Sequence, residues 1–429
     1  MENNQTRKDW LTLDNAAKIY PATSAKRSPA FFRITVTLKE PVKLWKLQEA
    51  LARIMPRFPY FQVFLHQGLF WYYLQKHQDI PDIKLLRHIG KSDLLIRSRT
   101  SHLISVSVRG KIIAVDISHI LTDGNGGIRF LASLTAEYLR LNGIKIDKHD
   151  NILTPDQRPD PDEFLDAHRF FFKSGIPKPP NLARAFHLKE NQSPENDFRI
   201  ITGKADVEKI LILCRNKGVS ITDYLASVYI HSLTVIYQNY VRNGMKPDSS
   251  LIRLEIPVDM RKFYPARTMR NFSLYVSPEI DLILGNYGFS DILKKVHHSM
   301  KIQVDDKELS RHISRNVAAE LNPFIRIIPL FMKNLYLSRL YLRLGEKIYS
   351  GVLSNLGLII LPEQMAAEID SFNVLFLPNQ IMKKSCCVIS YNENIHINIG
   401  STIRNRDFER CFFTKLVEDG IPVLVEEEQ

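Results

Sequence analysis

The sequence predicts an α/β protein made of two similar domains, each a two-layer sandwich. The chain of 429 residues is too long for one ordinary hydrophobic core. Strand-like and helix-like patterns alternate along both halves, which is typical of layered α/β domains. Between the halves, residues 147–200 are rich in proline and charge, as in a linker or an extended crossing segment. We assign residues 1–175 to an N-terminal domain, 176–200 to the crossing linker and 201–429 to a C-terminal domain.

In the N-terminal half, period-two alternation predicts strands and a three-four spacing of apolar residues predicts helices. The predicted elements are, in order, a strand over 31–38, a helix over 44–58, an aromatic strand over 69–74, strands over 103–108 and 112–118, and a helix from 128 to 142. Arg109 and Gly110 form the hairpin turn between the last two strands. In the second of these, Ile113, Val115 and Ile117 share one face by parity, and His119 continues it.

The C-terminal half uses the same patterns. The predicted elements are a helix over 206–216, a helix capped by Thr222 that runs to 240, strands over 251–258 and 272–276, a helix from 290, an apolar and basic stretch over 322–345, strands over 351–357, 372–377, 385–391 and 395–399, and a final helix from 407. Two interpretations of residues 322–345 remain open. The stretch is either a core helix with snorkelling basic ends or a surface that docks on a membrane holding a lipid substrate.

Composition bounds the class of protein. The formal net charge of +12 suits an anionic ligand, a nucleic acid or an acidic membrane surface, and equally a basic surface with no partner. The first residues have no apolar core and no stretch reaches the length of a membrane span, so we expect a cytoplasmic protein. Cys214, Cys386, Cys387 and Cys411 lack the spacing of a zinc site or a disulfide framework, which predicts reduced thiols and no metal.

The stretch SHILTDGNGG, residues 118–127, carries the strongest chemical signal. His119 ends a predicted strand, Asp123 and Gly124 form a turn, and a helix follows. A strand end that feeds a loop fixes a side chain and also exposes it. A histidine that is neutral at pH 7 can act as the base in acyl transfer from a thioester to an alcohol or amine. The bare His-x-x-x-Asp spacing arises by chance about once in such a chain, so the glycine and the flanking elements carry the argument.

This stretch resembles the HxxxDG motif of the chloramphenicol acetyltransferase-like superfamily, which includes the condensation domains of peptide synthetases. Further segments resemble, in order, the alcohol acetyltransferase-like branch of that superfamily. They are LDNAAKIYP at 13–21, IPVDMR at 256–261, RNFSLYVSPEID at 270–281, LSNLG at 353–357 and CVISYN at 387–392. Ser118 stands where condensation domains have a first histidine, and RNFSLY stands where plant-type members have DFGWG. The first departure argues against peptide-bond condensation.

The resemblance implies two similar domains that flank a central tunnel, with His119 as the general base. Asp123 and Gly124 would then be structural residues of the active site, and Arg261 is the candidate partner of Asp123. Asn271 and Asn355 are candidates for lining the tunnel, or else they bond turn backbone. Ser385 is a candidate oxyanion donor, or else a serine on a solvent-facing strand.

The resemblance also implies the function. We expect an acyltransferase that moves an acetyl or longer acyl group to a small alcohol. Acyl-CoA would be the co-substrate, and we expect no bound cofactor and no metal. A carrier-bound thioester is the alternative donor. The alternative function is a non-catalytic relative that binds a carrier domain, a lipid or a membrane. No motif supports nucleic-acid binding, and we expect a monomer.

Overall fold

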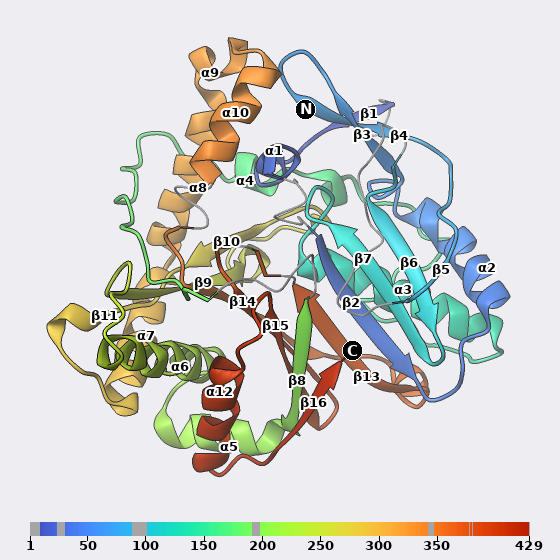
Figure 1. The fold of residues 1–429 in the computed structure, drawn as a ribbon. Helices are drawn as coiled ribbons and strands as arrows, with labels where there is room; N and C mark the ends of the chain where they lie inside the picture. Colours follow the sequence, from blue (N-terminus) through green and yellow to red (C-terminus); the bar gives the residue numbers. More distant parts are fainter. Residues whose placement is uncertain are drawn as a thin grey trace.

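The α/β prediction is confirmed. The computed structural model describes residues 9–23, 31–87, 101–190, 198–341, 347–376, 378–379 and 381–428. They form two mixed α/β halves, each with a sheet covered by helices (Figure 1).

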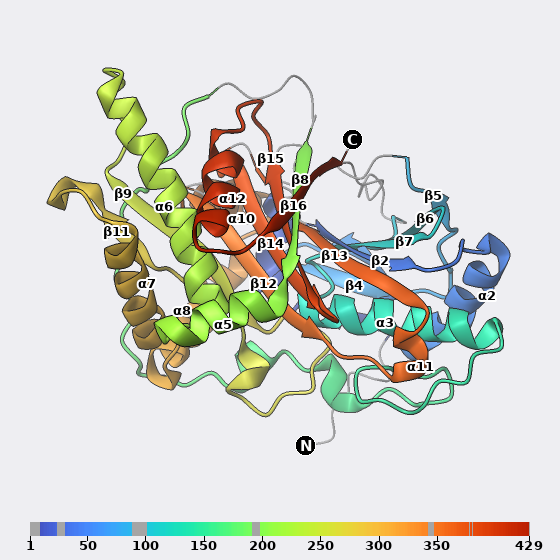
Figure 2. The ribbon, with the colours of Figure 1, turned by 90° about the horizontal axis from the view of Figure 1, so that it is seen from below.

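The first sheet holds the predicted hairpin at its centre. Its strand order is β13 (Ile369–Phe376), β2 (Phe31–Leu38), β7 (Ile112–Ser118), β6 (Ile104–Arg109) and β5 (Lys84–Leu85). Helices α2 (Leu44–Ile54) and α3 (Gly124–Leu141) pack against each other on one face of this sheet (Figure 2). The alternation that predicted β2 and β7 is therefore the inward face of a sheet packed on helices.

One strand of the first sheet comes from the far end of the chain. The strand β13 pairs antiparallel with β2, with Val374 opposite Ile34 and Phe376 opposite Phe32. Its residues Phe372 and Val374 belong to the N-terminal core. A pattern of apolar residues predicts such a strand, but it contains no information about the sheet that the strand will join.

The second sheet has both parallel and antiparallel pairs. Its order is β10 (Ser273–Val276), β9 (Leu251–Asp259), β12 (Gly351–Ile359), β14 (Lys384–Tyr391), β15 (Asn394–Ser401), β8 (Arg199–Asp206) and β16 (Val423–Glu428), and β11 (Glu279–Asp281) also pairs with β9. The strand β12 runs parallel to both β9 and β14. Helices α5 (Val207–Lys217), α6 (Ile221–Arg242), α7 (Phe289–Gln303) and α12 (Asp407–Glu418) cover one side.

The two hydrophobic cores meet at β14, every residue of which is buried. Because side chains alternate along a strand, Cys386 and Val388 face the C-terminal core while Cys387 and Ile389 face the N-terminal core. The four cysteines are all free thiols, as expected. A strand buried on both faces joins the halves through packing, in addition to the connecting chain.

The remaining elements lie around these sheets. They are β1 (Trp10–Thr12), β3 (Val63–Gln67) and β4 (Tyr72–Lys76), which form a small sheet, the helices α1 (Tyr20–Thr23), α4 (Ala167–Phe170), α8 (Asp306–Leu321), α9 (Pro323–Ile327), α10 (Leu330–Tyr341) and α11 (Glu363–Ala366), and the 3-10 helices η1 (Ala17–Ile19), η2 (Met55–Arg57), η3 (Pro161–Phe164), η4 (Met260–Lys262) and η5 (Leu282–Leu284).

Two local predictions are wrong. The aromatic stretch 69–74 is not one strand, because Leu69 and Phe70 form an exposed turn between β3 and β4. The N-cap of α6 is Ser220 rather than Thr222, since Ser220 forms a capping box with Asp223. Thr222 instead accepts a hydrogen bond from Asn355.

Candidate active site

His119 is the first residue after β7, and its ring is half-buried among aromatic side chains. The ring stacks on Tyr20 with centroids 5.2 Å apart and lies 4.7 Å from the ring of Phe32. A third ring, that of Phe376 at the end of β13, lies 5.9 Å away. Both neighbours in the chain, Ser118 and Ile120, are buried. The strand thus fixes the histidine backbone while the ring remains partly accessible.

The environment of His119 favours the neutral imidazole. Burial disfavours the imidazolium and lowers the pKa of His119 to about 4, while Asp123, the backbone of Thr122 and Asn271 act in the opposite direction. At pH 7 the ring is therefore unprotonated and able to accept a proton. The nearby carboxylate of Asp123 gives a proton-bearing ring some electrostatic stabilisation.

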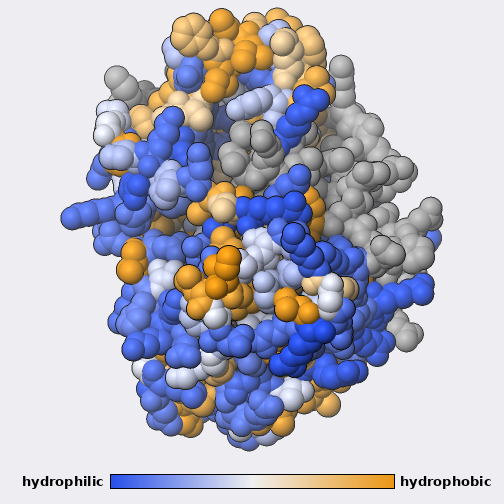
Figure 3. All heavy atoms as spheres, turned by 60° about the vertical axis from the view of Figure 1, so that its left-hand side comes forward, coloured by the Kyte–Doolittle hydropathy of each residue, from blue (hydrophilic) through white to orange (hydrophobic). Residues whose placement is uncertain are grey.

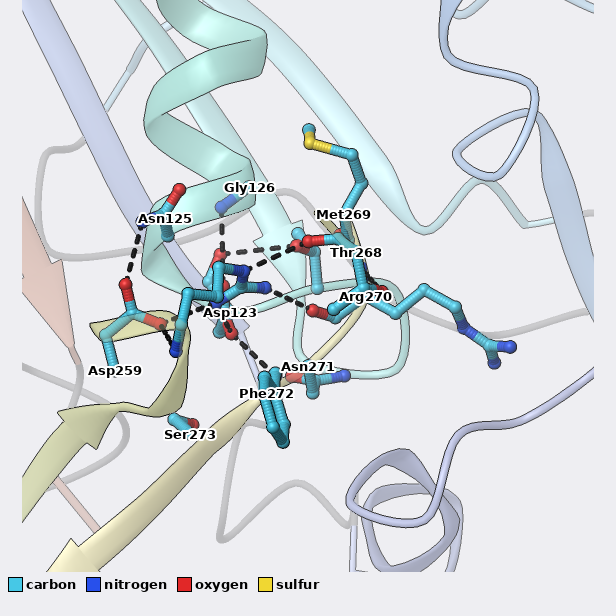
Figure 4. Close-up of polar contacts among 12 residues, drawn as sticks. Asp123, Asn125, Gly126, Asp259, Thr268, Met269, Arg270, Asn271, Phe272 and Ser273 are labelled. Carbon is cyan, nitrogen blue, oxygen red and sulfur yellow. Dashed lines mark hydrogen bonds and ion pairs between the residues drawn. The ribbon is translucent and has the colours of Figure 1, made fainter. Parts of the chain in front are cut away.

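Asp123 organises the turn that follows β7, through contacts with Gly126, Arg261 and Phe272 (Figure 4). It is the N-cap of α3, and its Oδ1 accepts a hydrogen bond from the backbone N–H of Gly126 at 3.3 Å. Its Oδ2 accepts from Arg261 Nη1 at 2.9 Å and from the N–H of Phe272 at 2.8 Å. These donors keep the pKa of Asp123 below its usual value, despite burial.

Arg261 joins Asp123 to the segment of the C-terminal half that carries RNFSLY. Its Nη1 also donates to Asp259, its Nε to the carbonyl of Thr268 at 3.0 Å, and its Nη2 to the carbonyl of Arg270 at 2.6 Å. The planar guanidinium can hold these two carboxylates and two carbonyls at once. The structure therefore brings Asp123 and Arg261 together, in the arrangement that the resemblance implied.

Glycine at two positions allows close contacts between the halves. A Cβ on Gly124 would lie 2.6 Å from Leu356 Cδ2 of β12. A Cβ on Gly126 would lie 2.0 Å from the hydroxyl of Thr122 and 2.9 Å from the carbonyl of Met269, and these two atoms are themselves hydrogen-bonded at 2.6 Å. The close approach of Leu356 therefore favours glycine at position 124, directly after the aspartate.

Asn271 holds the backbone of His119 in place. Its side-chain amide donates to the carbonyl of His119 at 2.9 Å and to Asp14 Oδ2 at 3.1 Å. Asp14 is fully buried, accepts from the N–H of Ala17 at 2.7 Å and lies 3.5 Å from Arg270. The opening segment LDNAAKIYP therefore reaches the site twice, through Asp14 and through the ring of Tyr20.

Ser385 and Asn355 make contacts outside this cluster. The buried hydroxyl of Ser385 donates to the carbonyl of Phe376 at 2.6 Å, so Ser385 contacts a residue that contacts His119. Asn355 donates to the hydroxyl of Thr222 and accepts from the N–H of Gly357, at the register shift between β12 and β14. Neither side chain has a hydrogen bond that places it on the histidine ring.

A cationic cavity of about 340 Å³ lies near the edge where β12 and β14 begin. Its lining includes the basic side chains of Arg184, His187, Lys189, Lys347 and Lys383 and one carboxylate, Asp248. Lys383 immediately precedes β14 and stands two residues before Ser385. No pattern in the sequence predicted this cluster, since its members come from distant segments. Among the residues that the structure describes, no group of three His, Cys, Asp or Glu side chains has metal-binding geometry.

Comparison with known proteins finds structural relatives only. No family model matches the chain, and no curated protein matches it. Among solved structures, the epimerization domain from the third module of tyrocidine synthetase B superposes with a TM-score of 0.60 at 10% identity, over 96% of each chain. TRI101 of F. graminearum, complexed with coenzyme A and deoxynivalenol, gives a TM-score of 0.60 at 11% identity, over 94% of this chain and 96% of TRI101. The chain has the chloramphenicol acetyltransferase-like fold.

A third match extends the chemistry found on this fold. The wax ester synthase/diacylglycerol acyltransferase from Marinobacter aquaeolei VT8 superposes with a TM-score of 0.55 at 12% identity, over 95% of this chain and all of that one. The chloramphenicol acetyltransferase-like fold therefore hosts an epimerization domain as well as acyltransferases. The fold alone does not distinguish these activities, which depend on the residues of the site.

Proposed function

We propose that the protein transfers an acyl group from an acyl-CoA thioester to an alcohol, with His119 as the general base. One observation carries the proposal. A half-buried imidazole with its pKa lowered to about 4 stands at a strand end, held by Asn271 and by the Asp123 turn. Such a ring is fully in its basic form at neutral pH, as a general base requires.

The reaction needs no covalent bond to the enzyme. As the alcohol oxygen attacks the thioester carbonyl, a ring nitrogen of His119 takes the hydroxyl proton. The tetrahedral intermediate then expels the CoA thiolate, which receives that proton, so the imidazole is regenerated. The carboxylate of Asp123 favours the transient imidazolium, because Asp123 raises the pKa of His119 against the effect of burial.

The cationic cavity supports a phosphate-bearing donor. Positive charge gathers at one opening, from the side chains of Arg184, Lys189, Lys347 and Lys383. An arginine can bind a phosphate group with two hydrogen bonds, and a lysine binds it as a point charge. The cavity is linked to the base through β14, since Ser385 binds the carbonyl of Phe376 and the ring of Phe376 lies 5.9 Å from that of His119. We propose that the phosphates of CoA occupy this cavity and that the thioester extends towards His119. TRI101, which shares the fold, was solved with coenzyme A.

A thiol-release screen tests the proposal. Acyl-CoAs of increasing chain length are mixed with the protein and a panel of alcohols and amines, and free thiol is measured over time. We expect acceptor-dependent release with alcohols, and we expect His119→Ala to abolish it. The matched control is His312→Ala, because His312 on α8 also has its pKa lowered to about 4 by burial. Equal rates in the His119→Ala variant and the unmodified protein would refute the assignment.

A further inference from the structure

Helix α10 has its polar and apolar faces reversed relative to an ordinary surface helix. Its solvent-facing side chains include Phe331, Met332, Leu335 and Tyr336, with exposed fractions between 52% and 64%. Lys333, in contrast, is 4% exposed and faces the protein. A helix on the surface of a protein in water normally buries its apolar face and exposes its charges. The expectation of a core helix with snorkelling basic ends is therefore not met by α10.

Specific contacts fix the reversed orientation. The ammonium of Lys333 donates to the carbonyl of Phe70 at 3.0 Å and lies 3.6 Å from the ring centroid of Trp71. Asn334 donates to the hydroxyl of Tyr72 at 2.8 Å. These inward polar contacts hold the helix on the turn between β3 and β4. Phe331, Met332, Leu335 and Tyr336 are left on the outward face, together with the exposed Arg339.

The apolar surface extends beyond α10. Phe324 and Ile327 of α9 are 79% and 69% exposed, and Leu69 of the adjoining turn is 72% exposed. The turn is bonded to α10, since the N–H of Leu330 donates to the carbonyl of Leu69 at 2.8 Å. Figure 3 shows these helices as an apolar cap at the top of the molecule. We call this surface the apolar cap, and define it as the exposed side chains of residues 69–70, 324–327 and 331–336.

The segment that carries most of the apolar cap has a net positive charge. Residues 322–341 contain no aspartate or glutamate, and the exposed Arg326 and Arg339 lie within them. An apolar surface with basic residues at its margin matches the interface of a membrane with anionic lipids, where apolar side chains enter the acyl boundary and arginines meet headgroups. In the described residues no single helix is long and apolar enough to cross a bilayer, and only the bent pair α5 and α6 passes that test together.

The apolar cap is connected to the candidate active site. Helix α10 packs against α1, and Tyr20 at the start of α1 stacks on the ring of His119. We propose that the apolar cap docks on an anionic lipid surface, and that a lipophilic alcohol or acyl chain passes from the membrane beside α1 to His119. The second part of this inference rests on the proposed function. The first part, docking, does not.

Flotation of the full-length protein with lipid vesicles tests docking without reference to activity. We compare vesicles of zwitterionic lipid alone with vesicles that contain anionic lipid, at low and high salt. The variant is Phe331→Ser with Leu335→Ser. The matched control is Ile283→Ser with Leu284→Ser, because these residues of η5 are more exposed, at 76% and 73%, but lie outside the apolar cap.

We expect the protein to float with anionic vesicles and to remain partly bound at high salt, since apolar insertion is not screened. The apolar-cap variant should lose at least about tenfold in partitioning, because each side chain forfeits its burial in lipid, while the control binds normally. No flotation of the unmodified protein, or equal flotation of the apolar-cap variant, would overturn the proposal. A dimer that the variant abolishes in ultracentrifugation, without vesicle binding, would assign the surface to a second copy and also overturn it.

A second measurement addresses the route to His119. Acyl transfer to a long-chain alcohol in vesicles should fall in the apolar-cap variant, while transfer to a short water-soluble alcohol stays unchanged. If both substrates lost activity equally, delivery from the membrane would be wrong. If neither substrate reacted with the unmodified protein, the proposed function would fail, and the flotation result would still decide whether the apolar cap docks.

Discussion

The ion pair between Asp123 and Arg261 allows the structural role of Asp123 to be measured separately from catalysis. Its side chains are only 9% and 13% exposed. Removing one partner of a buried pair typically costs about 3–5 kcal/mol, because the other charge stays buried. Asp123→Ala also deprives Gly126 and Phe272 of their acceptor, and loss of an N-cap adds about 1 kcal/mol. Arg261 keeps its ion pair with Asp259 in this variant, so its charge is not left unpaired. We therefore expect Asp123→Ala to lower the free energy of unfolding by about 3–4 kcal/mol in total.

A double-mutant cycle with Asp123→Ala and Arg261→Ala is the assay, with urea unfolding as the measurement. We expect the double variant to be less destabilised than the sum of the single variants, by about 2 kcal/mol. The control cycle uses Glu49 and Arg53, a pair that is 40% and 51% exposed and should couple by about 0.5 kcal/mol or less. If the Asp123–Arg261 coupling were no larger than that of the control pair, Asp123 would not brace the turn and our account of the motif would be wrong.

Three further predictions concern the site. Because the folded pKa of His119 is lowered to about 4, kcat/KM should stay constant as pH falls from 7 to about 5.5 and decline only near pH 4, and a midpoint near 6.5 in the pH profile would contradict this. Gly126→Ala should destabilise the protein by about 1–3 kcal/mol in thermal or urea unfolding, since its Cβ would clash with Thr122 and Met269; unchanged stability would mean that the contact relaxes freely. Lys383→Ala should raise KM for acyl-CoA several-fold in steady-state assays but leave KM for acyl-pantetheine unchanged, because Lys383 lines the cavity proposed for the CoA phosphates. An equal effect on both donors would mean that the phosphates of CoA do not bind in this cavity.

Much of the site could be predicted because it is local in the sequence. His119 follows the parity of β7, and Asp123 and the glycines lie within one turn at the start of α3. The Arg261 partnership required the resemblance, because no spacing rule pairs residues 138 positions apart. Spacing likewise left open whether Asp123 contacts the histidine.

Other parts of the site depend on the tertiary structure and leave no local pattern. The rings of Tyr20, Phe32 and Phe376 come from α1, β2 and β13, and only the folded chain places them around His119. Arg184 reaches Lys383 because the N–H of Ala185 bonds the carbonyl of Lys347 just before β12, and β12 begins beside β14. The orientation of α10 could not be predicted from the sequence either. A stretch of mixed apolar and basic residues predicts a helix, but not which of its faces is turned inward.

The pairing of β13 with β2 has a consequence for how the protein can be made. As the ribosome releases the N-terminal half, β2 has no partner on one side until residues 369–376 have emerged. Contacts across such a sequence separation form late, because closing the intervening loop costs entropy first. Meanwhile β2 is an open strand edge that can pair with another nascent chain. We therefore expect fragments that end before residue 369 to aggregate, and co-expression of the missing C-terminal piece to rescue their solubility.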